Sequence, residues 1–486
     1  MVVNFRLISK LLGPGILGLG LVAMIPSAYA GITGTDGFVV FGATALFAFA
    51  LGFLLLSQGL NVGIKKISVR ELFIFTTSLW VLAALIGSFP IYMICSDLDV
   101  PAAIFESTSA LSTTGATVLT DIDGRPRSVL LWRSILQWIG GIGFILVAIA
   151  ILPNVALGGM NIFKTESTSF DNFQKFTPRI KVLAFSIIGW YLLLTAVCAI
   201  LYMIGGMGFF MGVSSAMTTI STGGMMATDS QFNDMSLFVQ YTAILFMFIS
   251  ACSFLLTFRA AIKGEWGMLF RDQQIRGWFY AFVIISAIVA ASLMLQNGYE
   301  TERAIRVAMF NVATVVSTCG YALDDFSAWN NFTYLLFFIL LPIGACSGSS
   351  SGGLKIFRLQ ICLSMFFTQV KKSVHPHIVA SPTFNGRTIE SDTLRSIVTI
   401  ISAYMIALIV FSLLAVLLGG ININDAFSGT ITCLSNVGPA IGPNLGPSGS
   451  FFGLDSSVHL LWSCCMILGR LEILPVLLIF TRTFWK

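Results

Sequence analysis

The sequence of 486 residues is poor in charge, in histidine and in paired cysteine motifs. Only 10% of its residues are charged, against about 25% in an ordinary soluble domain, so the composition excludes a soluble globular protein. The three histidines, His375, His377 and His459, are too few and too dispersed to indicate a metal site. None of the nine cysteines forms a Cys-x-x-Cys pair, and most lie in apolar stretches, where a packing role is expected.

The loops also lack the short motifs of nucleotide-binding proteins and enzymes. No loop carries a Walker motif or a dinucleotide-binding fingerprint, so a regulatory nucleotide would have to act through a partner. Serines near residues 344–353 superficially suggest a nucleophile, but no histidine or lysine base lies at a suitable depth except Lys355. We therefore do not expect an enzyme.

Long apolar runs dominate what is present. Hydrophobic residues make up 56% of the chain, and a helix needs about 20 apolar residues to cross a bilayer. We expect an all-α integral membrane protein with ten crossings, near 11–30, 37–60, 72–95, 129–152, 182–204, 236–258, 277–296, 332–371, 396–419 and 458–481. Ala28-Tyr29-Ala30 looks like a signal-peptidase site, but we expect a retained helix, because the apolar run continues to Tyr29 and a second span follows.

Basic residues lie almost entirely on one side of these expected crossings. The connections that contain Lys65, Lys175 and Lys371 carry most of them, whereas Arg125 and Arg303 are among the few on the other side. The positive-inside rule therefore places both termini in the cytoplasm. Acidic residues gather on the outer side, either as a solvated face or as an anionic vestibule, and no single carboxylate is assigned a role. The cytoplasmic segments 164–181 and 371–395 are either docking surfaces or solvated loops.

Four outer connections, 96–128, 205–235, 297–331 and 420–457, share an unusual design. Each opens with an apolar, helix-like segment that is too short to cross a bilayer and continues into a polar strip that contains glycine. The short segments are 102–111, 209–220, 304–316 and 426–434. This order of elements indicates re-entrant loops.

A related pentapeptide follows each short segment. The four are Ser112-Thr113-Thr114-Gly115-Ala116, Ser221-Thr222-Gly223-Gly224-Met225, Ser317-Thr318-Cys319-Gly320-Tyr321 and Ser435-Asn436-Val437-Gly438-Pro439. All fit Ser-[Thr/Asn]-x-Gly, and their glycines are 109, 96 and 118 residues apart, which indicates internal repetition. A selectivity filter replaces the water around a cation with backbone carbonyls, and glycine reaches the unusual dihedrals that point successive carbonyls at one axis. The partially negative C-terminal ends of the short helices would also favour a cation there. The alternative is that these glycines only cap helices on interfacial turns.

Four span–loop–span units in one chain resemble the Trk/Ktr/HKT superfamily of potassium transport proteins, specifically the pore-forming subunit of the bacterial Trk system. Motifs that carry the resemblance include Leu136-Gln137-Trp138-Ile139-Gly140-Gly141-Ile142-Gly143, Ile151-Leu152-Pro153, Thr177-Pro178-Arg179, Val374-His375-Pro376, Leu468-Gly469-Arg470-Leu471-Glu472-Ile473 and Thr483-Phe484-Trp485. The resemblance implies two N-terminal helices (1–68) followed by four pseudo-fourfold pore repeats, at 69–155, 178–263, 273–375 and 393–486.

The resemblance also implies which residues bind K⁺, the transported ion. The selectivity filter would comprise Thr113, Thr114, Gly115, Thr222, Gly223, Gly224, Thr318, Cys319, Gly320, Asn436, Val437 and Gly438. Serine at the first filter position goes with sodium permeation in this superfamily, so four glycines imply potassium preference. Met225 and Tyr321 stand where phenylalanine is common, and Ser435-Asn436 replaces a paired Asn, which leaves the strictness of selectivity open.

A glycine-rich and serine-rich stretch interrupts the expected span at 332–371. Such a stretch cannot stay regular helix in lipid, so it lines a cavity or is buried in protein. The resemblance implies an intramembrane gate loop, and a static packing kink is the alternative. The gate residues would be Gly344, Ser347, Gly348, Ser349, Ser350, Ser351, Gly352, Gly353, Lys355 and Arg470. Arg470, in the middle of the last span, would face the pore or else form a structural ion pair.

The resemblance implies potassium uptake across the bacterial inner membrane by a homodimer. A separate cytosolic TrkA-like subunit that binds NAD or ATP would regulate it. The alternative is a sodium- or proton-coupled secondary transporter of another cation, which is also rich in broken helices. Such a transporter predicts two halves related by inversion, whereas this sequence has four units of the same sense.

Overall fold

The computed structural model is almost entirely helical and describes residues 3–60, 62–63, 67–151, 177–442, 444–447 and 449–486. Its first elements are α1 (Phe5–Thr33), α2 (Phe38–Gln58), α3 (Val69–Ile94), α4 (Val100–Leu111), the short 3₁₀ helix η1 (Ile122–Gly124), α5 (Arg127–Ile151), α7 (Thr177–Ile204), α8 (Phe209–Ile220), α9 (Leu237–Ser250) and α10 (Phe254–Lys263). Then follow α11 (Gly267–Arg271), α12 (Gln273–Gln296), α13 (Thr301–Val316), α14 (Asn331–Leu340), β1 (Ile343–Gly344), β2 (Leu354–Lys355) and α15 (Ile356–Val374). The chain ends with β3 (Thr383–Phe384), β4 (Arg387–Thr388), α16 (Ser391–Gly419), α17 (Ile423–Ser435), α18 (Ser456–Arg470), α19 (Ile473–Ile479) and α20 (Arg482–Trp485).

Seven described helices are long and apolar enough to cross a membrane, and the number rises to nine if each of two bent pairs is one span. The protein is therefore a multi-pass helical membrane protein. The expected number of ten crossings stays a prediction, because the stretch at 332–371 is divided between α14 and α15. The expected spans at 236–258 and 458–481 are each divided between two helices, so each is a broken span or a re-entrant loop. The pair α9 and α10 bends by 101°, and the pair α18 and α19 bends by 114°.

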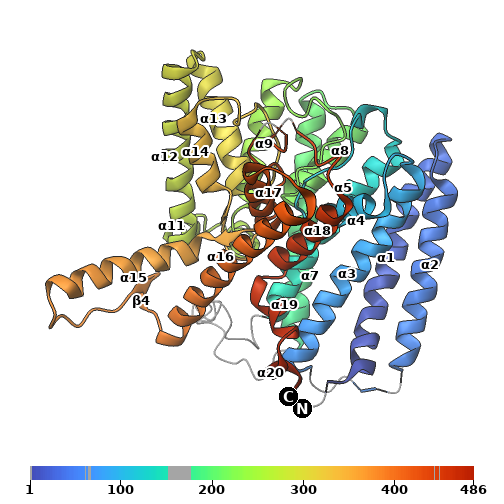
Figure 1. Ribbon diagram of the computed structural model, residues 1–486, viewed down its shortest axis with the longest axis horizontal. Helices are drawn as coiled ribbons and strands as arrows, with labels where there is room; N and C mark the ends of the chain where they lie inside the picture. Colours follow the sequence, from blue (N-terminus) through green and yellow to red (C-terminus); the bar gives the residue numbers. More distant parts are fainter. Residues whose placement is uncertain (1–2, 61, 64–66, 152–176, 443, 448) are drawn as a thin grey trace.

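The short apolar segments are helices, as expected, and two of them, α4 and α17, begin at a side-chain cap. Asp99 accepts a hydrogen bond from the Ala102 amide at the start of α4, where Pro101 fits the first turn. Asn422 caps α17 in the same way. The segments α4, α8, α13 and α17 each pack against the helix before them. In Figure 1 these four helices lie in the half of the molecule opposite the marked chain ends.

The two N-terminal helices pack on each other, and α1 also contacts α3 and α5. The rings of Phe5 and Trp485 stack with their centroids 6.4 Å apart, so the two ends of the described chain meet. Helix α15, the hairpin of β3 and β4 and the start of α16 project to one side (Figure 1). The predicted docking segment 371–395 lies on this projection, whereas most of segment 164–181 lies outside the described residues.

Candidate functional site

The four pentapeptides share one backbone conformation. Their second residues all have positive φ: 55° at Thr113, 54° at Thr222, 58° at Thr318 and 54° at Asn436. A β-branched threonine rarely adopts this left-handed conformation, whereas asparagine tolerates it. In every copy, the amide of the third residue donates to the carbonyl five residues earlier, at 2.8–3.1 Å. The repeat seen in the sequence is therefore a repeat of strained local geometry, which packing around it must hold in place.

The four glycines bring the loops together in a ring. Their φ values are 89° at Gly115, 73° at Gly224, 86° at Gly320 and 106° at Gly438. A Cβ added to any one of them would collide with the third-residue carbonyl oxygen of the next loop. The colliding pairs are Gly115 with Gly223, Gly224 with Cys319, Gly320 with Val437, and Gly438 with Thr114. The contacts run from repeat one to two, three, four and back to one, so the loops surround one axis in chain order.

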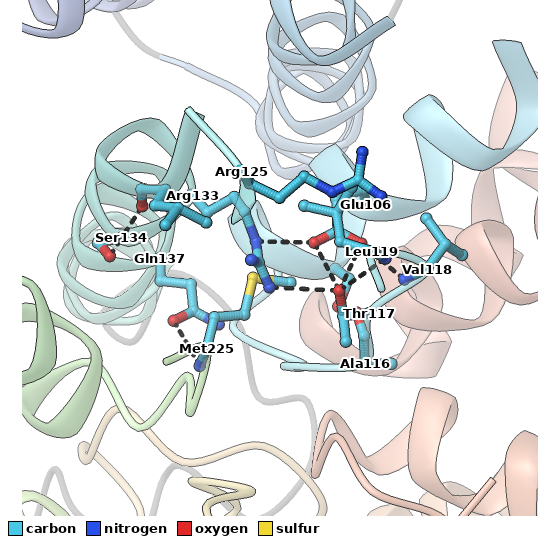
Figure 2. Close-up of polar contacts among 12 residues, drawn as sticks. Glu106, Ala116, Thr117, Val118, Leu119, Arg125, Arg133, Ser134, Gln137 and Met225 are labelled. Carbon is cyan, nitrogen blue, oxygen red and sulfur yellow. Dashed lines mark hydrogen bonds and ion pairs between the residues drawn. The ribbon is translucent and has the colours of Figure 1, made fainter. Parts of the chain in front are cut away.

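Side-chain hydrogen bonds connect the second and third loops to neighbouring repeats. Gln137 on α5 donates from Nε2 to the carbonyl oxygen of Gly223 at 2.6 Å. Its Oε1 accepts a hydrogen bond from the Met225 amide at 3.2 Å (Figure 2). The buried hydroxyl of Tyr321 lies 2.5 Å from Thr218 Oγ1 and donates to the Ser215 carbonyl at 3.0 Å. Tyrosine in place of the phenylalanine common in the superfamily therefore ties the third loop to α8.

A cavity of about 250 Å³ adjoins the ring and is lined by all four glycines. Asp121 and Asp229 also line it, from the connections that follow α4 and α8. Two buried side-chain oxygens of the pentapeptides, Thr113 Oγ1 and Asn436 Oδ1, have no hydrogen-bond partner among the described residues. Buried unsatisfied oxygens are costly. A dehydrated cation is one ligand that would satisfy them.

The glycine-rich and serine-rich stretch forms a tight loop directly against the pentapeptides. Its ends pair as parallel strands, Ile343 with Leu354 and Gly344 with Lys355. Inside the loop, the buried Ser349, Ser350 and Ser351 lie between Gly348 and Gly353, which have φ of 73° and 65°. Thr222 donates to Ser350 Oγ at 3.2 Å, and the Gly352 amide donates to Thr318 Oγ1 at 2.7 Å. A Cβ on Gly352 would collide with the Ser435 carbonyl and meet the Asn436 side chain.

Two buried cations hold this loop. Arg470 donates to the Ser350 carbonyl at 2.8 Å and to the Gly140 carbonyl at 3.3 Å. Lys355 donates to the carbonyl oxygen and to the hydroxyl of Ser351. The Arg470 guanidinium lies 4.5 Å from the ring centroid of Phe144, and the Lys355 ammonium 5.6 Å from it, within cation–π range. Thus all the predicted gate residues except Arg470 lie in or beside one loop, and Arg470 contacts that loop from α18.

The last expected span, in whose middle Arg470 was predicted to lie, is divided at this residue. Arg470 is the last residue of α18, at the 114° bend, where the helix ends and free carbonyls and the loop surround it. Glu472 has φ of 59° and forms an ion pair with Arg358 at 2.6 Å, so it is not the partner of Arg470. The sequence left two possibilities for Arg470, a position that faces the pore or a structural ion pair. In the structure, its hydrogen-bond partners are backbone carbonyls on the loop and on α5.

Several residues at the site were missed from the sequence. Gln137 and Phe144 come from α5, Arg358 from α15, and Glu106 and Arg133 form a buried ion pair beside the first pentapeptide. Gln274 on α12 accepts a hydrogen bond from the Ser347 amide at 2.6 Å. A charged residue within an expected apolar segment was the available signal for Glu106 and Arg133, whereas the glutamines carried no local signal.

Comparisons with known proteins found similar proteins over most of the chain. The family model described as TrkH, cation transport protein, matches residues 40–485. The Trk system potassium uptake protein TrkI of Halomonas elongata is 36% identical, over 86% of this chain and 84% of that protein. TrkH of Escherichia coli K12 is 30% identical, over 99% of this chain and 100% of that protein. The crystal structure of the potassium transporter TrkH from Vibrio parahaemolyticus matches 99% of this chain and 100% of that chain, with TM-score 0.91 and 28% identity. The chain belongs to the TrkH family of cation transport proteins.

Proposed function

We propose that the protein takes up potassium ions through the axis of the four glycine loops. The observation that carries the proposal is the closed ring in which each glycine meets the backbone carbonyl of the next loop. Four loops of one conformation around one axis can surround a single ion with oxygen ligands, as a selectivity filter requires. The relatives named potassium uptake proteins support K⁺ as the ion.

The proposed K⁺ ligands are the residues predicted from the sequence, from Thr113 in the first loop to Gly438 in the fourth. Short helices that end at the pentapeptides direct their partially negative ends toward the ring, which favours a cation. Asp121 and Asp229 beside the cavity would raise the local cation concentration at an outer mouth. Crowding between neighbouring loops would keep the ring at one size.

The loop at 344–353 is the proposed gate. Ser350 contacts Thr222 and the Gly352 amide contacts Thr318, two second-position residues of the ring. In this proposal an ion leaving the ring would have to pass the loop. Arg470 and Lys355 would stabilise this blocking position through the carbonyls of Ser350 and Ser351. Their charges would also raise an electrostatic barrier to a cation. Movement of the loop would open the path.

Regulation is proposed to come from the cytoplasm. The projection at residues 371–395 is basic at Lys371 and Lys372, which are exposed, and it would offer a docking surface to a TrkA-like subunit that binds NAD or ATP. In this proposal the protein is a homodimer in the bacterial inner membrane, with both termini cytoplasmic. Four pore repeats, at 69–155, 178–263, 273–375 and 393–486, follow the two N-terminal helices.

The test is potassium uptake by a bacterial strain that lacks its own uptake systems. We expect the wild type to restore growth at low potassium and Gly115→Ser to lower the ratio of K⁺ to Na⁺ uptake, because its side chain collides with the Gly223 carbonyl. The matched control is Gly298→Ser: Gly298 also has positive φ (70°), but a Cβ there meets no atom within 4 Å. An unchanged ratio in Gly115→Ser, with wild-type uptake, would reject the filter.

A further inference from the structure

A buried ion pair lies behind the first of the four loops. Glu106 on α4 is 0% exposed and Arg133 on α5 is 2% exposed, and Arg133 Nε lies 2.8 Å from Glu106 Oε1. Removing two charges from water costs free energy that their mutual attraction often fails to offset. A buried pair of this kind is therefore poorly explained by stability alone.

The Glu106 carboxylate binds the segment that follows Gly115. The Thr117 hydroxyl lies 3.0 and 3.1 Å from its two oxygens, and the Val118 amide donates to it at 2.8 Å (Figure 2). Arg133 Nη2 donates to Thr117 Oγ1 at 3.3 Å, and the Leu119 amide donates to the same oxygen at 3.0 Å. These contacts fix residues 117–119, two to four positions after Gly115, to both α4 and α5.

The other repeats lack this carboxylate. Counting nine positions back from each glycine gives Glu106, Ser215, Asn311 and Gly429. In the second repeat, Ser215 Oγ donates a longer contact, 3.5 Å, to Met226 Sδ, at the position equivalent to Thr117. A side-chain contact between the short helix and the second residue after the glycine thus exists in repeats one and two. Only in the first repeat does a charged side chain, Glu106, make this contact.

The counterpart of Arg133 in the fourth repeat is an uncharged side chain, Trp462. Gly140 and Gly469 occupy equivalent places, because a Cβ on either would collide with the carbonyl of the last leucine in α4 or α17. Seven positions before them stand Arg133 and Trp462. The Trp462 ring fills the space beside Gly429, and a Cβ on Gly429 would lie 2.6 Å from it. Packing at this place can therefore be achieved without charge.

Arg133 also lies beside the proposed ion path. It lines the cavity that the four glycines share, and its Nη1 is buried with no partner among the described residues. A positive charge so placed would repel a cation, and the adjacent Glu106 carboxylate offsets it. The pair thus holds residues 117–119 in place without adding a net charge at the cavity wall.

We infer that Glu106, Arg133 and Thr117 are positioning residues that set the ion selectivity of the first loop. The inference rests on the proposed function. It adds that the glycine ring keeps its size only while Glu106 and Arg133 hold residues 117–119 in place. Gly115 meets the second loop on one side, and Gly438 meets Thr114 of the first loop on the other. A shift of residues 115–119 would therefore loosen two of the four contacts in the ring.

Three variants in purified, reconstituted protein separate geometry from charge. Thr117→Val removes the linking hydroxyl at constant size and charge, and should lower the K⁺/Na⁺ flux ratio about tenfold, equivalent to about 1.4 kcal/mol, while K⁺ flux is retained. Glu106→Gln should lower both the ratio and the K⁺ flux, because it leaves Arg133 uncompensated. Glu106→Gln with Arg133→Gln should restore K⁺ flux but not the ratio.

The matched control is Asp97→Asn, which breaks an outer ion pair of the same repeat. Asp97 and Arg125 lie 2.6 Å apart, and hydrogen bonding to Arg125 lowers the pKa of the Asp97 carboxyl. This variant should keep the wild-type ratio. A wild-type ratio in Thr117→Val overturns the inference, even if Glu106→Gln does not fold. If Gly115→Ser also keeps the wild-type ratio, the filter itself is rejected, so the two failures are distinguishable.

Discussion

Replacing Arg470 by glutamine removes a charged contact between the proposed gate loop at 344–353 and the rest of the protein. The variant loses a charged hydrogen bond to the Ser350 carbonyl at 2.8 Å, a longer one to Gly140 and the cation–π contact with Phe144. Glutamine retains a donor and much of the volume, so the change is mainly one of charge and reach. We expect the loop to leave its proposed blocking position more often.

The magnitude follows from the contacts. A hydrogen bond to a charged group contributes about 1.5–3 kcal/mol, and a desolvated cation–π contact about 2 kcal/mol. If about 2 kcal/mol of this total is specific to the blocked position, the ratio of open to blocked protein rises roughly 30-fold. Removing the positive charge would also lower the proposed electrostatic barrier to K⁺, which acts in the same direction.

The assay is ⁸⁶Rb⁺ or K⁺ flux into liposomes that contain the purified protein without any partner subunit. Arg470→Gln should raise this basal flux roughly 30-fold. Arg470→Lys, which keeps the charge but not the two-pronged contact, should raise it less. Equal folded amounts are checked by size-exclusion chromatography. Basal flux in Arg470→Gln at or below the wild-type level would refute the assignment of Arg470 to the gate.

Three further outcomes are expected from the same contacts. Deleting residues 348–351 should produce a constitutively leaky pore in the flux assay, and unchanged basal flux in folded protein would show that the loop is not the gate. Gln274→Ala removes the acceptor of the Ser347 amide and should raise basal flux several-fold, since one buried hydrogen bond contributes about 1 kcal/mol. Gln137→Leu leaves the Gly223 carbonyl and the Met225 amide unpaired, so it should lower the melting temperature and the K⁺/Na⁺ ratio together, and a wild-type ratio would contradict its bracing role.

The short helices and their glycine motifs could be predicted from the sequence because their signals are local and occur four times. An apolar segment of about 12 residues, capped by Asp99 or Asn422, predicts a helix that cannot span the membrane. Glycine at 115, 224, 320 and 438 predicts positive φ, and the structure has it at all four. The left-handed second residue was not predicted, because threonine is a poor indicator of that conformation.

Features that depend on distant parts of the chain could not be predicted. The last apolar run gives no sign of a 114° bend, which the structure places where Glu472 turns to pair with Arg358, 114 residues away. Likewise, Glu106 and Arg133 lie on separate helices, and only folding brings them together. Sequence patterns report periodicity and local conformation, whereas ion pairs between separate helices depend on how those helices are arranged in space.

The most direct test of the potassium filter is to locate the ion. Crystals of the protein are grown in Rb⁺, a heavier substitute for K⁺, and anomalous diffraction data are collected. The anomalous difference map should show a peak on the axis between Gly115, Gly224, Gly320 and Gly438. Gly115→Ser in the same Rb⁺ concentration should weaken or shift that peak. A flux-competent protein whose Rb⁺ peaks all lie away from this ring would contradict the account.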